Sequence, residues 1–210
     1  MSVPLDRRLL LRLALCCTAT VLGSPYAAIA SDPTAPVEQL HAGLSEIMKA
    51  GRSVSFRQRY EKIAPVISQT FDLEAIVRQV IGLRWAALPP EQQVALTDAF
   101  RRYTIASYVA NFDGYSGERF DLLPTITAAG NDRVVQTRLV SASGQGHMLA
   151  YVMRQAAGGW RIVDVLAEGS VSRVAAQRSE VRSLLADGGG AGLLVSLRRK
   201  TAELSGGILQ

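Results

Sequence analysis

The apolar residues change their spacing twice along this chain, and the change restricts the folds open to it. From Val37 to Tyr108 they recur at helical intervals of three and four residues. From Arg119 to Leu166 they gather in short runs rich in β-branched and aromatic residues. Helical spacing returns from Val171 onward. Helices, then strands, then helices again are typical of an α+β domain.

The middle region contains four strand-like runs: 119–123, 133–140, 147–154 and 160–166. The glycine turns Gly144-Gln145-Gly146 and Gly158-Gly159 separate the last three, which predicts an antiparallel meander of hairpins. One face of such a sheet is covered by helices, and the other can curl around a cavity. We therefore expect helices packed on a curved, roughly four-stranded antiparallel sheet that encloses an apolar pocket, a cone-shaped (NTF2-like) arrangement.

The helical segments carry their own boundary signals. Asp72 suits an N-cap before an apolar stripe, and Leu88-Pro89-Pro90-Glu91 suits the start of a longer helix. Pro65 is expected to bend or end the helix that contains it. Gly188-Gly189-Gly190 should separate the last two helices.

The first thirty residues have the pattern of a cleavable secretory signal. A positively charged start precedes the short apolar run 13–22, and Ala28-Ile29-Ala30 supplies the small residues of a cleavage site. The apolar run is shorter than the roughly 20 residues that span a bilayer as a helix. We expect a signal peptide at 1–30 and a single domain at 31–210, with export by either the Sec or the twin-arginine route.

The composition of residues 31–210 narrows the function. Both cysteines, Cys16 and Cys17, fall in the expected signal, so the domain is held by its core without disulfides. Removing the signal's three arginines and one aspartate leaves 20 basic and 17 acidic residues, a net charge of +3. These charges are scattered, which argues against a nucleic-acid partner and allows only a weak attraction to anionic lipid head groups. We expect a monomer.

Motifs for catalysis or metal binding are weak. Glu38 and His41 have an i,i+3 spacing found in metal sites, but the sequence lacks the second such pair, which favours two polar residues on a solvated face. The segment Gly188–Gly192 follows a helical stretch and lacks the Lys-Ser/Thr of a phosphate loop. Asp164, within the last strand, suits either a general base facing a cavity or, preferably, a structural carboxylate paired with an arginine. We expect neither a cofactor nor a metal.

Several motifs, taken in order, resemble the MlaC-type proteins, also called the toluene-tolerance auxiliary family. They are Gly82-Leu83-Arg84-Trp85, Leu88-Pro89-Pro90-Glu91-Gln92-Gln93 with Phe100, Tyr115-Ser116-Gly117-Glu118, Trp160-Arg161-Ile162-Val163-Asp164-Val165 with Glu168-Gly169, and Gly188-Gly189-Gly190-Ala191-Gly192-Leu193-Leu194. The segments 111–118, 169–172 and 177–180 look most like the hopanoid-associated HpnM branch. The likeness covers nearly all of residues 31–210.

The resemblance implies a soluble periplasmic lipid carrier without catalytic activity. Such a protein binds the tails of a phospholipid or hopanoid and exchanges them with an inner-membrane complex. The implied complex is an ABC transporter with a ring-forming substrate-binding protein, or an RND-type exporter in the hopanoid branch. Two other functions stay open: an exported cone-fold enzyme that acts on a polycyclic substrate, with Asp164 as base, and a ligand-free interaction module of an envelope complex.

Alternation along the strands predicts which side chains line the pocket. Leu149, Tyr151 and Met153 point to one side of their strand, and Val163 and Val165 form the better apolar pair of the next. The full expected lining is Trp85, Tyr103, Leu139, Leu149, Tyr151, Met153, Val163 and Val165. Each of these residues suits an ordinary core equally well. Arg84 or Arg119 could meet a phosphate head group or be solvated.

Overall fold

The structure, a computed structural model, describes residues 32–209. The expected signal peptide and both cysteines lie outside the described residues. Within residues 32–209 the chain forms six α-helices, two short 3-10 helices and one sheet. The helices are α1 (Ala35–Ala50), η1 (Gly51–Ser53), α2 (Phe56–Thr70), α3 (Leu73–Ile81), η2 (Gly82–Ala87), α4 (Pro90–Asn111), α5 (Arg173–Asp187) and α6 (Gly189–Leu204). No helix in this range is both long and apolar enough to cross a membrane.

The starts and ends of helices follow local hydrogen bonds. Asp72 caps α3, because its carboxylate accepts a 2.9 Å hydrogen bond from the Ala75 N–H. The helix ends at Gly82, whose φ of +69° suits glycine. Gly188 separates α5 from α6, and Gly189 and Gly190 are already the first two residues of α6.

Pro65 does not end its helix, which was one of the two outcomes expected of it. The helix α2 continues through it to Thr70. A capping box between Ser55 and Gln58 fixes the start of α2, and Ile63 and Ile67 on either side of the proline are fully buried. These interactions offset the one backbone hydrogen bond that proline cannot donate.

The sheet is an antiparallel meander of five strands in chain order, not four. Its strands are β1 (Arg119–Ala129), β2 (Asp132–Val140), β3 (Gly146–Ala156), β4 (Gly159–Ala167) and β5 (Val171–Ser172). The fifth strand forms because Glu168 and Gly169 take positive φ angles and turn the chain back along β4. With two residues, β5 is too short to show an alternating pattern in the sequence.

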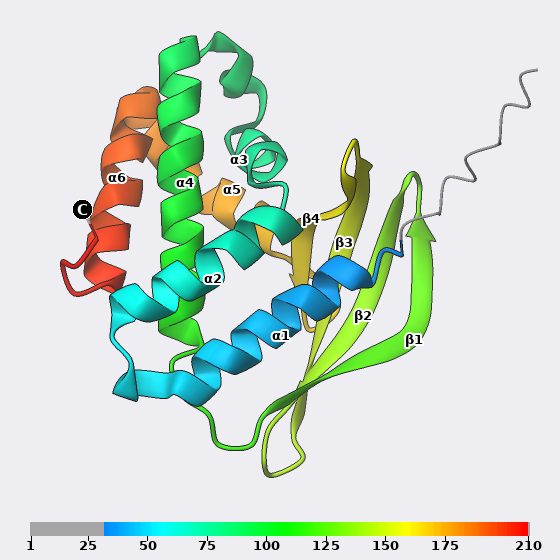
Figure 1. Cartoon of the computed structure of the whole chain (residues 1–210). Helices are drawn as coiled ribbons and strands as arrows, with labels where there is room; N and C mark the ends of the chain where they lie inside the picture. Colours follow the sequence, from blue (N-terminus) through cyan, green and yellow to red (C-terminus); the bar gives the residue numbers. More distant parts are fainter. Residues whose placement is uncertain (1–31, 210) are drawn as a thin grey trace, which may run out of the picture. The chain divides into compact units, whose positions relative to one another are not determined.

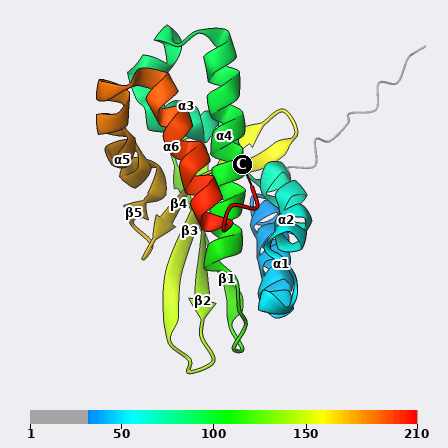
Figure 2. The same cartoon turned by 90° about the vertical axis from the view of Figure 1, so that its left-hand side faces the viewer.

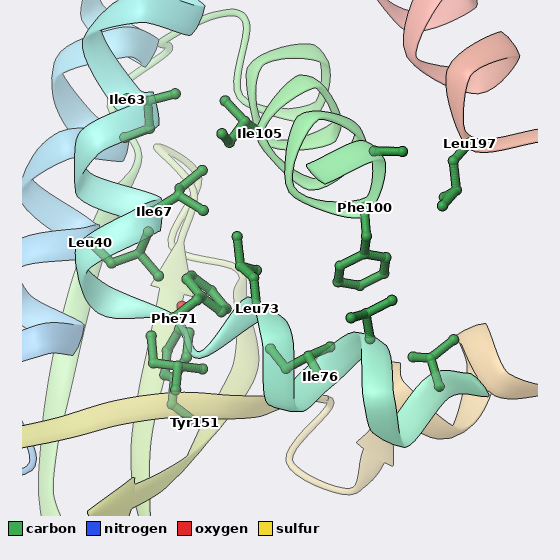
Figure 3. Packing of buried hydrophobic residues seen from close by; sticks show 14 of the residues in the cluster. Leu40, Ile63, Ile67, Phe71, Leu73, Ile76, Phe100, Ile105, Tyr151 and Leu197 are labelled. Atoms are coloured by element: carbon green, nitrogen blue, oxygen red, sulfur yellow. The ribbon is translucent and has the colours of Figure 1, made fainter. Parts of the chain in front are cut away.

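The helices cover one face of the sheet (Figure 1). The helix α1 lies along this face, and the corner between α2 and α3 is tied to β4 by a 2.9 Å hydrogen bond from the Asp72 N–H to the Ile162 carbonyl. Figure 2 shows α4 behind α6, with α5 on one side and α1 and α2 on the other. The core gathers between these layers, where Leu40, Ile67 and Tyr151 come from helices and sheet alike (Figure 3).

A register shift in the sheet decides which side chains face the helices. Tyr151 on β3 lies opposite Val165 on β4, but Met153 lies opposite Ile162. Val163 is therefore the extra residue of a bulge, and strict alternation does not hold along β4.

Candidate functional site

A cavity of about 440 Å³ lies between α3, α4, the strands β3 and β4, and the start of α5. Its volume falls within the range of about 300–1,000 Å³ that is usual for small-molecule sites. Most of the lining is apolar or aromatic: Phe71, Leu73, Ile76, Phe100, Tyr103, Tyr108, Phe112, Leu149, Tyr151, Val165, Ala167 and Val174. The polar lining residues are Thr104, Ser107, Asn111, Asp164, Arg173 and Gln177.

The inner wall of the cavity belongs to the hydrophobic core. Phe71, Leu73 and Ile76, at the end of α2 and along α3, are more than nine-tenths buried and line the cavity as well. In Figure 3, Phe100 reaches from α4 toward α3, and Phe71 lies beside Tyr151 of β3. One set of side chains therefore stabilises the fold and shapes the cavity.

Aromatic rings continue this wall toward the end of α4. The ring centroids of Phe71 and Tyr108 are 5.7 Å apart, and those of Tyr108 and Phe112 are 5.9 Å apart with nearly parallel planes. Burial raises the pKa of Tyr108 and of Tyr151, so both phenols are neutral. The wall presents a large apolar area without charge.

His41 of α1 is buried and contacts Tyr151, a residue that lines the cavity. Its Nε2 atom lies 3.0 Å from the Tyr151 hydroxyl, and its ring stacks on Phe120 with 4.3 Å between centroids. Burial lowers the pKa of His41 to about 4, so the imidazole is neutral at pH 7. Glu38 is exposed whereas His41 is buried, so the two residues do not share the solvated face that we expected. Among residues 32–209, no three His, Cys, Asp or Glu side chains are grouped as metal ligands would be.

Asp164 is a structural carboxylate. Its Oδ1 atom accepts hydrogen bonds from the backbone N–H groups of Val165 and Val174 at 2.7 and 3.1 Å, and its Oδ2 atom accepts one from the Ser172 hydroxyl. The partner is therefore the start of α5, not the arginine that we expected. A carboxylate bound in this way fixes α5 to β4, and its acceptor positions are largely occupied by the protein itself.

The structure brings four of the eight expected pocket residues to one cavity. Tyr103, Leu149, Tyr151 and Val165 line it. Tyr151 and Val165 lie directly opposite each other in the β3–β4 register. The cavity is therefore between the sheet and its covering helices, not on the other face of the sheet as we expected.

The other four, Trp85, Leu139, Met153 and Val163, lie elsewhere. Trp85 is buried in η2 beside Arg78, Leu139 lies opposite Phe120 in the β1–β2 pair, and Met153 is fully buried. Val163 is also buried, at the bulge. Strand alternation does not describe the bulge at Val163, and it carries no information on Trp85, which lies in η2.

The two arginines considered for a head group also lie away from the cavity. Arg84 donates a hydrogen bond to the Leu185 carbonyl near the end of α5. Arg119 pairs with Asp121 at 3.1 Å on β1. The arginine that does line the cavity is Arg173, the first residue of α5.

Apart from Tyr103, sequence reasoning missed the wall that α4 contributes. Phe100, Ser107 and Asn111 recur at intervals of four and seven residues, which places them on one side of the helix. This spacing can be recognised in the sequence, but α4 also buries Leu96, Ile105 and Val109 on its other sides. A helix with apolar residues around much of its circumference does not reveal which side meets a cavity.

Fold and cavity together define an α+β domain with a largely apolar internal site. The sequence matches the family model described as "MlaC protein" over residues 38–199, and the chain therefore belongs to the MlaC family. No curated protein matches the sequence.

One solved structure is similar to the chain over most of its length. It is described as the phospholipid-binding protein from Ralstonia solanacearum in complex with a phospholipid. The two superimpose with a TM-score of 0.72 at 20% sequence identity, covering 83% of this chain and 99% of the other. The likeness establishes a common fold.

Proposed function

We propose that this protein is a lipid carrier that holds the acyl tails of a phospholipid, or the rings of a hopanoid, in the cavity between α4 and the sheet. The cavity itself is the observation that carries the proposal, because its lining is mainly aliphatic and aromatic. Family membership and the fold shared with a phospholipid-binding protein support it.

The energetics of tail burial suit this site. Each methylene removed from water is stabilised by roughly 0.8 kcal/mol, so a carrier must offer apolar surface comparable to that of the bilayer it draws from. Leu73, Ile76, Leu149 and Val165 offer aliphatic surface, and Phe71, Phe100 and Tyr108 offer ring faces. A site of this kind needs no reactive group, and the occupied acceptors of Asp164 support carriage over catalysis by a polycyclic-substrate enzyme.

The proposed location is the periplasm. The signal-like segment 1–30 supports export with cleavage after Ala30, which leaves residues 31–210 as the working domain. There the protein would act as a monomer and exchange lipid with an inner-membrane complex, either an ABC transporter with a ring protein or an RND-type exporter. Hopanoid remains a candidate cargo on the strength of the segments that resemble the HpnM branch.

The experiment is native mass spectrometry of the exported protein purified without detergent, followed by extraction of the bound molecule. We expect about one lipid per protein, and its identity would assign the cargo as phospholipid or hopanoid. A protein that is empty as isolated and takes up nothing from vesicles would overturn the proposal in favour of a ligand-free interaction module.

A matched pair of variants locates the lipid. Val165→Trp fills the cavity from β4, whereas Leu166→Trp places the same side chain at the next position, which does not line the cavity. Val165→Trp should lose most lipid capture while Leu166→Trp retains it. Equal capture by the two variants would place the lipid elsewhere.

A further inference from the structure

Two helices present polar side chains to the same cavity at matching spacing. On α4, Ser107 and Asn111 are four residues apart, and on α5, Arg173 and Gln177 are four residues apart. Residues i and i+4 share one face of a helix, so each helix contributes one such pair, and α4 adds Thr104. The pairs interrupt a lining that is otherwise mainly apolar.

The four side chains differ in their exposure to solvent. Arg173 and Asn111 are exposed, whereas Gln177 and Ser107 are half-buried. The exposed members mark the mouth of the cavity, and the half-buried members lie on the way to its apolar wall. A ligand with a charged end, an intermediate polar section and an apolar end matches this order.

The charge at the mouth is uncompensated. Within residues 32–209, none of the four side chains hydrogen-bonds or forms an ion pair with another part of the protein. Asp164, the acidic residue of the lining, is engaged by Ser172 and Val174. The Val174 and Ala175 amides at the start of α5 are likewise taken, by Asp164 and Ser172, so the Arg173 guanidinium is the group left to meet an anion.

Arg173 is also close to the aromatic wall. Its positive charge acts on the Tyr108 phenol, opposing the rise in the pKa of Tyr108 that burial causes. Tyr108 and Arg173 both line the cavity, the first from α4 and the second from α5.

We propose that Arg173, with Asn111, Gln177 and Ser107, binds the phosphodiester and glycerol region of a glycerophospholipid whose tails fill the apolar part of the cavity. This inference rests on the proposed lipid-carrier function and deepens it, because it assigns the cargo to lipids that carry a phosphate. Guanidinium binds phosphate oxygens through paired N–H donors, and the amide and hydroxyl groups below it suit the ester oxygens.

The test is a competition between two lipids with the same tails. The protein is incubated with vesicles of phosphatidylglycerol and diacylglycerol of identical acyl chains, re-isolated, and its bound lipid is measured by mass spectrometry. The wild type should be enriched in phosphatidylglycerol relative to the vesicles. Arg173→Gln should reduce this enrichment about tenfold, as expected when a hydrogen-bonded ion contact is lost.

Arg182→Gln is the matched control. Arg182 is exposed on the same helix and does not line the cavity, so its loss makes the same change in net charge. This variant should keep the wild-type enrichment. An equal loss in both variants would show general attraction between a basic protein and an anionic vesicle, and would overturn the assignment of Arg173.

The remaining outcomes separate the two proposals. Uptake of both lipids without preference by the wild type would overturn the phosphate site and leave the carrier function standing. No uptake of either lipid would overturn both. Inorganic phosphate is the probe for a small-anion site: displacement of bound phosphatidylglycerol by phosphate at equal concentration would show that the mouth binds free anions, not a lipid head group.

Discussion

The Nε2 atom of His41 lies 3.0 Å from the hydroxyl of Tyr151, which joins α1 to β3. Because burial lowers the pKa of His41 from 6.5 to about 4, the unfolded chain takes up a proton in this range that the folded protein does not. The free energy of unfolding should therefore fall as the pH drops from 6.5 to 4, by at most about 1.4 kcal/mol per pH unit. Urea unfolding at a series of pH values measures this slope.

A pair of histidine variants isolates the source of that slope. His41→Gln retains a hydrogen-bonding side chain without the titration, and should flatten the dependence. His147→Gln alters an exposed histidine beside Glu168 and should leave it in place. A slope that survives in His41→Gln would mean that other groups cause it.

The Thr104 hydroxyl predicts a stabilising substitution. It is buried and finds no hydrogen-bond partner in the described part of the chain. An unsatisfied buried hydroxyl costs about 1–3 kcal/mol, so Thr104→Val should raise the free energy of unfolding by about 1 kcal/mol. That gain corresponds to a Tm higher by about 2–4 °C for a domain of this size.

Thr97→Val is the control on the same helix. The Thr97 hydroxyl donates a 2.9 Å hydrogen bond to the Gln93 carbonyl, so its removal should bring no gain in Tm. A lower Tm for Thr104→Val than for the wild type would show that the Thr104 hydroxyl has a partner after all.

Asp164 should matter for stability and not for lipid capture. Asp164→Ala removes the acceptor of the Val165 and Val174 amides and of the Ser172 hydroxyl, and should lower the free energy of unfolding by about 2 kcal/mol. Asp187→Ala, at the other end of α5, should cost much less, since Asp187 is exposed. Denaturant unfolding and vesicle uptake check both parts. A loss of function without a loss of stability would point to a chemical role for Asp164.

Tyr103 should set the length of ligand that fits. With Phe100 and Gln177, it lines both the main cavity and a neighbouring space of about 30 Å³ between α3, α4, α5 and α6. Tyr103→Ala should join the two spaces and shift the captured lipids toward longer or bulkier tails. Because Tyr103 is only half-buried, the cost in stability should be about 2 kcal/mol.

Tyr60→Ala provides the comparison for that shift. Tyr60 is half-buried on α2 and does not line the main cavity, so its loss should leave the distribution of chain lengths unchanged. Lipid extraction and mass spectrometry report both distributions. Identical distributions in the two variants would show that the space behind Tyr103 does not admit a tail.

Much of the fold could be predicted from local sequence signals. The helical spacing around Leu40 and Leu44, the cap at Asp72 and the glycine turns between hairpins depend on neighbouring residues, and the structure has each of them. Pro65 does not end α2, because the burial of Ile63 and Ile67 outweighs the local preference of proline.

The cavity was only half predictable for a related reason. Tyr151 and Leu149 follow strand alternation, which is local, and both line the cavity. Val163 departs from alternation at a bulge. The amino-acid composition of β3 and β4 does not predict the register shift that occurs there. The contribution of α4 depends on where α3 and α5 dock, which is a tertiary relationship.

Four residues belong both to the hydrophobic core and to the cavity lining: Phe71, Leu73, Ile76 and Phe100. An apolar molecule bound in the cavity therefore packs against the core itself. A guest in the cavity adds its own contacts to side chains that hold the helices on the sheet, so the loaded form resists unfolding more than the empty one, in proportion to ligand concentration and affinity. Release of the bound molecule therefore lowers the free energy of unfolding of the protein. Any molecule that removes the ligand must bind it with an affinity that offsets this loss of stability.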